Sequence, residues 1–179
     1  MKQFRGAGLL CMTLLAIAGG QAWAVQAASA ASKPQDTQWL VLLPENERAA
    51  AAGAPALPSS HNFLDEAPGQ ALAQSQAFVV NEALAGRLIR MPGYVVPINL
   101  DDKGRVTEFF LVPYYGACIH MPPPPPNQVV YVVPAQPFTL KSLTTPYWVT
   151  GQMKIGSKTT RLGAAAYTVT GASPEIYKN

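Results

Sequence analysis

The sequence predicts a mainly β protein: a small five-stranded barrel resembling an OB-fold, preceded by a short helical extension. Two observations support this class. Five runs are rich in Val, Ile, Tyr and Phe and are separated by Gly, Pro and Asp, and the first contains Pro92-Gly93, where glycine indicates a bulge or bend. A bent strand favours a closed or half-closed barrel; an open sandwich is the alternative. The five runs cover residues 87–99, 105–115, 128–133, 147–154 and 164–170.

Turns and helices complete this plan. Residues 101–104, Asp-Asp-Lys-Gly, predict a hairpin between the first two runs, and residues 155–158 around Gly156 predict the turn between the last two. Pro44 and two acidic residues at its start predict a helix over 45–52, and residues 70–77 predict another short helix. The expected domains are a disordered arm over 25–38, an N-terminal extension over 39–80 and the barrel over 81–179.

The first 24 residues have the pattern of a cleaved secretory signal peptide. Lys2 and Arg5 precede an apolar run over residues 8–18, and Ala22-Trp23-Ala24 predicts cleavage before Val25. The apolar run is shorter than the roughly 20 residues of a transmembrane helix. The sequence therefore predicts a periplasmic protein with no membrane span in its mature chain.

Charge and cysteine content narrow the function further. The chain has 13 Lys and Arg and 10 Asp and Glu, so loss of Lys2 and Arg5 with the signal leaves 11 against 10. A nearly neutral chain lacks the positive surface expected of a nucleic-acid-binding protein and the basic cluster expected at a membrane surface. The mature chain retains one cysteine, Cys118, which excludes an intramolecular disulfide. Its thiol is expected to be buried, bound to metal or chemically used.

Cys118 and His120 are the strongest metal-binding candidates. On an extended strand, residues two apart project to one face and lie about 6.6 Å apart. Thiolate and imidazole together favour zinc or copper over magnesium or calcium, so zinc is the expected cofactor. A zinc site needs three or four protein ligands. His61, the other histidine of the chain, is the best further candidate, although a solvated loop histidine is the simpler interpretation.

Five consecutive prolines follow this segment. They favour a stiff polyproline II spacer about 16 Å long. The spacer could cross between barrel strands or could present a docking surface to an aromatic-lined groove of a partner. Aromatic residues elsewhere in the strand region are expected mainly in the core. The predicted partner-contact residues are Pro122, Pro123, Pro124, Pro125, Pro126, Tyr114 and Tyr115.

Three segments carry a resemblance to an uncharacterised bacterial family of exported proteins and lipoproteins. They are residues 92–97 (PGYVVP), residues 107–114 (TEFFLVPY) and residues 116–128, which contain Gly-Ala-Cys-Ile-His, the pentaproline and Asn-Gln. The resemblance covers about residues 80–170. It implies a small OB-like barrel and a gene neighbourhood with an ABC-type permease and ATPase, in some bacteria under zinc control. It implies no activity. Unlike the lipidated members, this chain has Leu10 before Cys11 and no lipobox.

Three functions follow as expectations. The first is a periplasmic accessory or binding protein that handles zinc or another soft metal alongside an ABC transporter. The second is a metal-free protein–protein interaction module that uses the pentaproline segment. The third is a thiol-dependent enzyme or redox partner, which requires an exposed thiol of lowered pKa. The sequence has no Cys-x-x-Cys, phosphate-binding glycine loop or paired-carboxylate signature, so a non-enzymatic role is favoured and no catalytic residue is predicted.

Overall fold

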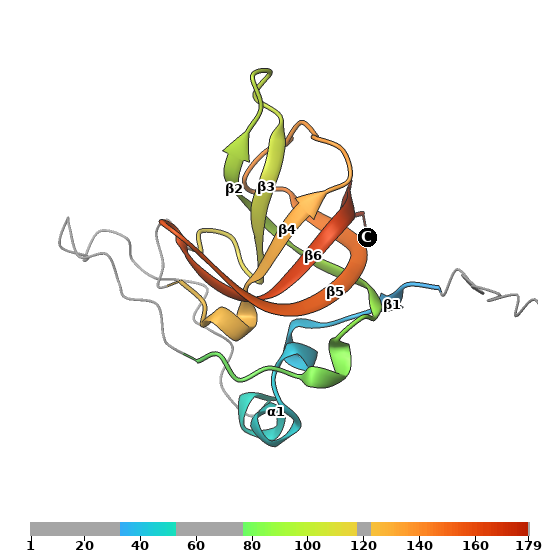
Figure 1. Ribbon diagram of the computed structural model, residues 1–179, viewed down its shortest axis with the longest axis vertical. Coiled ribbons are helices and arrows are strands. Elements are labelled where there is room, and N and C mark those ends of the chain that lie inside the picture. Colours follow the sequence, from blue (N-terminus) through green and yellow to red (C-terminus); the bar gives the residue numbers. More distant parts are fainter. Residues whose placement is uncertain (1–32, 53–76, 118–122, 179) are drawn as a thin grey trace, which may run out of the picture. The chain divides into compact units, whose positions relative to one another are not determined.

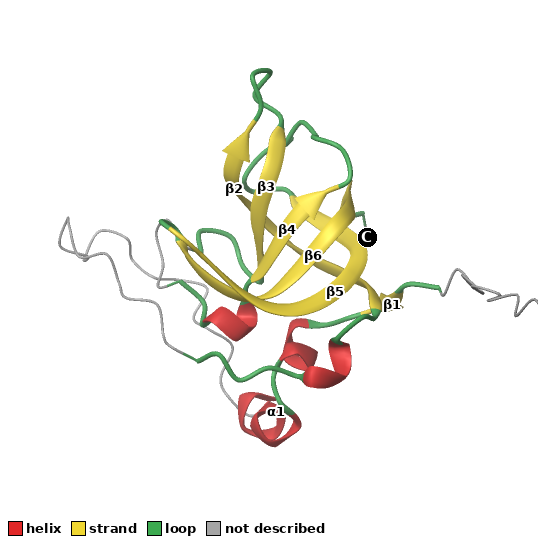
Figure 2. Cartoon of the chain, in the orientation of Figure 1, coloured by secondary structure: helices red, strands yellow, loops and turns green. Residues whose placement is uncertain are grey.

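The computed structural model describes residues 33–52, 77–117 and 123–178. These residues form a mainly β structure, in which one mixed sheet of six strands is accompanied by short helices (Figures 1 and 2). The strands are β1 (Gln35–Asp36), β2 (Leu88–Leu100), β3 (Val106–Val112), β4 (Val130–Pro134), β5 (Pro146–Thr160) and β6 (Gly163–Ile176). The helices are α1 (Glu45–Ala52) and the 3-10 helices η1 (Trp39–Leu42), η2 (Glu82–Leu84) and η3 (Pro126–Gln128).

The strands pair in the order β1-β2-β3-β4-β6-β5, and β5 also pairs with β2. The first half of β2 pairs with β5, from Leu88 to Tyr94, and the second half pairs with β3, from Tyr94 to Leu100. The β4–β6 pair is parallel, and the other pairs among β2 to β6 are antiparallel. Each of these five strands therefore has a partner on both sides.

Alternation along β2 separates an inner from an outer face. Ile89, Met91 and Val95 are buried in the main hydrophobic core, whereas Arg90 and Tyr94 point to the other face and are half-buried. Inward residues of the other strands complete the core, including Phe109, Leu111, Val130, Val132, Val149, Met153, Tyr167 and Val169. The core is thus built from alternate positions on all five long strands.

Hydrogen bonds attach the N-terminal extension to this core. The Tyr167 hydroxyl donates to the Leu42 carbonyl at 2.5 Å and accepts from the Asn81 backbone N–H at 2.7 Å. The Asn81 side chain donates to the Val41 carbonyl at 2.9 Å. One buried tyrosine on β6 therefore holds both η1 and the segment before η2.

The five predicted runs correspond to β2 to β6, but the strand count of five is wrong for the described residues because β1 adds a sixth. This strand has two polar residues, too few for a periodic signal, and lies inside the range predicted as a disordered arm. The predicted helix over 45–52 is confirmed as α1. The predicted helix over 70–77 falls almost wholly outside the described residues. None of the described helices has the length and apolar character to cross a membrane.

Two predictions about glycine need correction. Gly156 was expected in a turn, but β5 continues to Thr160 and the chain turns at Arg161 and Leu162. Gly156 lies where the β5–β6 register shifts, so this glycine marks a bulge within the strand and not a turn. At Pro92-Gly93 the register continues without a shift, and the irregularities in β2 come later, between Pro97 and Leu100.

Gly93 has a different role, which is to permit close packing. A Cβ atom there would lie 2.8 Å from Leu111 Cγ, 2.8 Å from the Val112 carbonyl oxygen and 2.9 Å from Trp39 Cζ2. The position is next to Tyr94, where β2 changes its partner from β5 to β3. Glycine is therefore required where β2, β3 and η1 come closest together.

Candidate functional site: an exposed aromatic strip

The outer face of the first half of β2 carries a concentration of ring side chains. Pro92 and Tyr94 point outward from β2, and their register partners in β5 are Trp148 and Pro146. Side chains of register partners lie on the same face of a sheet. The pairing of β2 with β5 therefore brings these four rings together on the surface.

Arg90 and four aromatic rings form what we call the aromatic strip. The Arg90 guanidinium carbon lies 4.1 Å from the centre of the Trp148 ring. Trp148 stacks on Tyr177, with ring centres 5.0 Å apart and planes 27° apart. The ring centres of Tyr94 and Tyr115 lie 6.3 Å apart, and their ring planes are inclined at 58°. Stacking and cation–π contacts of this kind hold side chains in fixed positions and leave ring surface for a ligand.

A shallow pocket of about 240 Å³ lies at the strip, and both Tyr94 and Tyr177 line it. Its other lining residues are Trp39, Pro92, Gly93, Pro113 and Pro146. A second open pocket of about 470 Å³ lies at the Arg90 end and is lined by Arg90, Trp148, Glu175, Ile176 and Lys178. The strip is thus an apolar groove with charged groups at one end.

Trp39 forms part of the groove through a specific contact with β2. Its indole N–H donates to the Pro92 carbonyl at 2.8 Å, and its ring packs over Gly93. The absence of a side chain at Gly93 allows this approach. The N-terminal extension therefore supplies one wall of the strip and is not a separate appendage.

Exposure distinguishes the strip from ordinary core. Within the strip, the Tyr115 ring is 48% exposed and the other three rings are half-buried. Ile176, which lines the second pocket beside the strip, is 41% exposed. Arg90 also forms a long ion pair with Asp36, in which its Nη1 atom lies 3.8 Å from Asp36 Oδ1. Scattered exposed apolar residues are normal on a protein surface, but a contiguous group marks an interaction site.

The second half of the same outer face is covered. We call its buried residues the covered patch: Val96, Phe110, Val112, Ala117, Val129, Tyr131 and Ala165. Phe110 packs edge-to-face on Tyr131, with ring centres 6.3 Å apart. Burial, a hydrogen bond to the Glu108 carboxylate and its negative charge together raise the pKa of Tyr131 to about 12. The patch therefore acts as a second core on the outer side of the sheet.

The predicted metal ligands Cys118, His120 and His61 lie outside the described residues. The described residues contain no group of three or more His, Cys, Asp or Glu side chains that could hold a metal ion. Zinc binding through these three residues therefore stays a prediction.

The predicted partner-contact residues have varied environments. Pro124 and Pro126 are buried and Pro123 and Pro125 are half-buried, while Pro122 lies outside the described residues. Pro125 has the expected extended backbone (φ −58°, ψ 151°), but Pro126 already begins η3, so the polyproline II spacer is shorter than predicted.

The two predicted tyrosines separate. Tyr114 packs against the covered patch, whereas Tyr115 belongs to the aromatic strip. Sequence reasoning missed Tyr94 and Trp148 because aromatic residues in strands were assigned to the core. Arg90 and Tyr177 were not considered as site residues. The signal that could have found Trp148 is its place beside Tyr147, since neighbouring strand residues face opposite sides.

Asn127, directly after the prolines, fixes this connection to the fold. It is buried, its backbone N–H donates to the Ala77 carbonyl at 3.2 Å, and its side-chain amide donates to the Val79 carbonyl at 2.9 Å. Its Oδ1 atom is the buried side-chain polar atom without a hydrogen-bond partner among the described residues. The chain directly after the prolines is therefore firmly packed.

Comparison with known proteins gives one family and one solved structure. The model of a family described as "Protein of unknown function (DUF3299)" matches residues 39–175. A crystal structure of a DUF3299 family protein from Pseudomonas aeruginosa PAO1 is similar, with 37% sequence identity and a TM-score of 0.66. The match covers 83% of this chain and 99% of that one. None of the curated proteins compared with the chain matches it.

Proposed function

The chain belongs to the DUF3299 family, and we propose that it is an exported accessory protein that binds an extended segment of a partner protein along the aromatic strip. The observation that carries this proposal is the partly exposed set of ring and guanidinium contacts made by Arg90, Trp148, Tyr177, Tyr94 and Tyr115. Trp, Tyr and Arg are the side chains that most often dominate binding energy at protein interfaces. A shallow groove between rings suits an extended chain better than a globular partner.

We also propose that β2 to β6 form an OB-like barrel. The support is the pairing of every one of these strands on both sides, with a single parallel pair between β4 and β6. OB-folds bind ligands on an outer sheet face and in adjacent loops. The strip occupies an outer face of this kind, although fold analogy alone does not assign a ligand.

The proposed location is the periplasm, reached through the signal peptide ending before Val25. The proposed partner is a component of an ABC-type transporter, as the family resemblance of the sequence suggests. The nearly neutral mature charge supports a protein partner over nucleic acid.

The test is binding to the ABC-type permease in lipid nanodiscs, with strip variants compared against matched exposed residues. We expect Trp148→Ala and Tyr115→Ala each to weaken binding about tenfold or more, as for hot-spot aromatic residues. Leu100→Ala and Leu143→Ala change other exposed apolar side chains and should leave affinity unchanged. Equal losses in both pairs, or no binding by the native protein, would contradict the proposal.

Zinc binding through Cys118 and His120 is a second candidate function. The observation that favours it is the packing at both ends of their segment: Ala117 is fully buried before it, and Pro124 and Pro126 are buried after it. Anchored ends restrict the positions open to the ligands, which lowers the entropy cost of forming a metal site. The chemistry that suits zinc is that of the donors, a thiolate and an imidazole.

Calorimetric zinc titration of the mature protein tests this second candidate. Stoichiometric binding should be lost in Cys118→Ser and in His120→Ala, and His61→Ala should show whether the third histidine takes part. Met121→Leu is the control within the same segment. A folded native protein that binds no zinc would eliminate this candidate without affecting the strip.

A further inference from the structure

The β5–β6 hairpin continues beyond the region where β5 pairs with β2. The last β2–β5 register pair is Leu88 with Gln152, and two backbone hydrogen bonds of Met153, to Gly86 and Arg87, both at 2.8 Å, complete that contact. Over residues 154–160, β5 pairs with β6 alone among the described residues. Figure 1 shows the two strands continuing together to the turn. One backbone edge of β5 therefore has no strand partner there among the described residues, and we call it the open edge.

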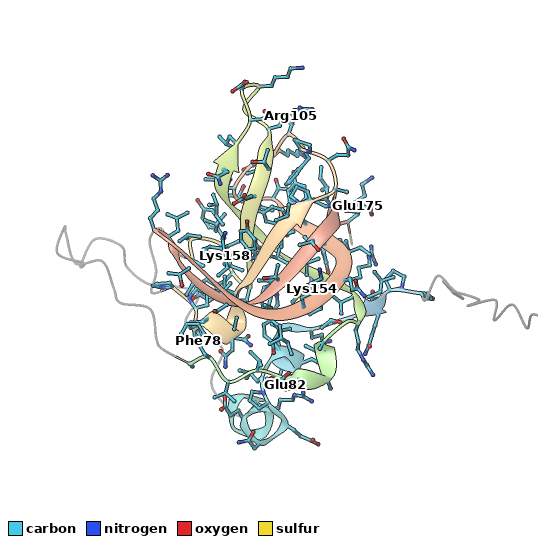
Figure 3. The ribbon with its side chains drawn as sticks, in the orientation of Figure 1. Phe78, Glu82, Arg105, Lys154, Lys158 and Glu175 are labelled. Carbon is cyan, nitrogen blue, oxygen red and sulfur yellow. The ribbon has the colours of Figure 1, made fainter. Side chains whose placement is uncertain are left out.

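The end of this hairpin around its turn, residues 154–170, carries cations and no acids. Lys154, Lys158 and Arg161 are exposed, and the sequence has no Asp or Glu between Glu108 and Glu175. Figure 3 labels both lysines on the hairpin. Within the described residues the ion pairs are Arg90–Asp36 and Arg105–Asp101, so none of the three hairpin cations is paired there. The Lys158 ammonium instead lies 4.9 Å from the ring centre of Tyr131.

We propose that this open edge, residues 154–160 of β5, binds an extended acidic segment of another protein, which adds a strand to the sheet. An added strand gains affinity from main-chain hydrogen bonds, and side chains beside it give specificity. Acidic side chains of the added strand would lie next to Lys154 and Lys158. The proposal is independent of the aromatic strip, which lies on β2 and the other end of β5.

The same lysines explain why this edge is not a general aggregation site. Lysine on an edge strand ordinarily discourages pairing with other chains. A second copy of this protein would bring like charges together, which is unfavourable for cross-strand pairs. An acidic strand turns this repulsion into attraction, so charge both rejects self-association and selects the partner.

An anionic membrane is the competing occupant of a basic surface. Membrane-binding clusters usually contain about four to eight basic residues, more than the three on this hairpin. An added strand requires a sheet edge with unpaired backbone groups, whereas binding to a lipid surface does not. The observations therefore favour an acidic protein segment.

The probe is a fluorescent seven-residue peptide of alternating Glu and Val, compared with a peptide of alternating Lys and Val. Binding to the mature protein is followed by anisotropy at about 0.02 M and about 0.2 M salt, because screening weakens exposed ion pairs. We expect the Glu peptide to bind and to weaken with salt, and the Lys peptide not to bind. Failure of the Glu peptide to bind at low salt would overturn the proposal.

Charge-matched variants locate the site. Replacing the hairpin cations (Lys154→Gln, Lys158→Gln and Arg161→Gln) should weaken Glu-peptide binding about tenfold, which corresponds to about 1.4 kcal/mol. Replacing three exposed lysines elsewhere (Lys33→Gln, Lys103→Gln and Lys141→Gln) makes the same change in net charge and should alter binding less than about twofold. Equal losses in the two triple variants would overturn the proposal.

Two further readouts separate strand addition from other binding modes. Backbone amides within residues 154–160 should gain protection from hydrogen exchange when the Glu peptide binds. Peptide binding without this protection would show attraction between charges alone and would overturn strand addition. Vesicles of phosphatidylglycerol that bind through the hairpin cations, with no peptide binding, would assign the hairpin to a membrane and also overturn the proposal.

Discussion

The two halves of β2 present similar side chains on their outer face but have different surroundings. The first half presents Pro92 and Tyr94, which are half-buried and line the aromatic strip, although Tyr94 also packs against the edge of the covered patch. The second half presents Val96, which is 6% exposed in the covered patch. The alternation of side chains along β2 places these residues of both halves on the same outer face. The comparison shows that an outward-facing apolar residue becomes core or binding surface according to what packs over it.

This difference separates stability from binding along one strand. Residues of the covered patch remove apolar area from water within the protein and should contribute to folding. Residues of the aromatic strip keep part of that area accessible and should contribute chiefly when a partner covers it. Substitutions matched across the two halves therefore test whether the covered patch is a second core and whether the strip is a site.

The largest expected effect is in the covered patch. Phe110 is fully buried and packs on Tyr131, so Phe110→Ala should lower the free energy of unfolding by about 3–5 kcal/mol through lost contacts and a cavity. Chemical denaturation measures the change. Trp148→Ala removes a half-buried ring from the strip and is the matched substitution. A loss for Phe110→Ala no larger than that for Trp148→Ala would contradict the distinction between the two halves.

The strands were predictable from the sequence, whereas the strip was not. Runs rich in Val, Ile, Tyr and Phe between turn residues place β2 to β6 approximately, because this composition is local to each segment of the chain. Tyr147 and Trp148 show the limit. Both are large aromatic neighbours on β5, yet Tyr147 is 3% exposed and Trp148 contacts Arg90 and Tyr177 on the surface. Which of the two faces inward depends on the long-range pairing with β2 and β6, which no local pattern contains.

The predicted site raises a second limit. Cys118 and His120 attract attention because of their chemistry, which is readable in sequence. The strip has no such signature, since it assembles residues from η1, β2, β5 and the C-terminal segment. Of the residues in the strip, Tyr115 alone was predicted as a contact residue, and the β2–β3 pairing brings Tyr94 close to it.

Alkaline pH should remove the stability that Tyr131 contributes to the covered patch. The folded-state pKa of Tyr131, about 12, lies above the ordinary value of 10, so the unfolded chain loses this proton first as pH rises. Stability from Tyr131 is therefore full below pH 10 and falls between about pH 10 and 12, by roughly 2–3 kcal/mol in total.

The measurement is the pH dependence of unfolding of the native protein and Tyr131→Phe. Burial also raises the pKa of Tyr167, so the difference between the two proteins isolates Tyr131. The native protein should lose stability more steeply than the variant over this pH range. If the unfolding free energies of the two proteins changed with pH in parallel, the pKa of Tyr131 would not be raised by folding. Its ring would then be less buried than the covered patch requires.

A smaller effect is expected at the boundary between the halves. Gly93→Ala would place a methyl group against Leu111, Val112 and Trp39, so the strands or η1 must move. Overpacking of this kind typically costs about 1–3 kcal/mol. Because the new methyl group would contact the Trp39 ring, tryptophan fluorescence should change as well. Gly104→Ala is unsuitable as a control because its φ is +73°, whereas Gly156→Ala adds a Cβ to open space and should be nearly neutral.

The smallest expected change in stability is the most informative about the strip. Tyr115 is 48% exposed and contacts Tyr94 at the end of β3, so Tyr115→Ala should alter the free energy of unfolding by less than about 1 kcal/mol. Thermal denaturation measures this, and Tyr114→Ala, one residue earlier on the covered patch, should cost clearly more. A large loss for Tyr115→Ala would mean that its ring serves folding. A small loss would mean that the ring contributes little to folding and is available for contact with a partner.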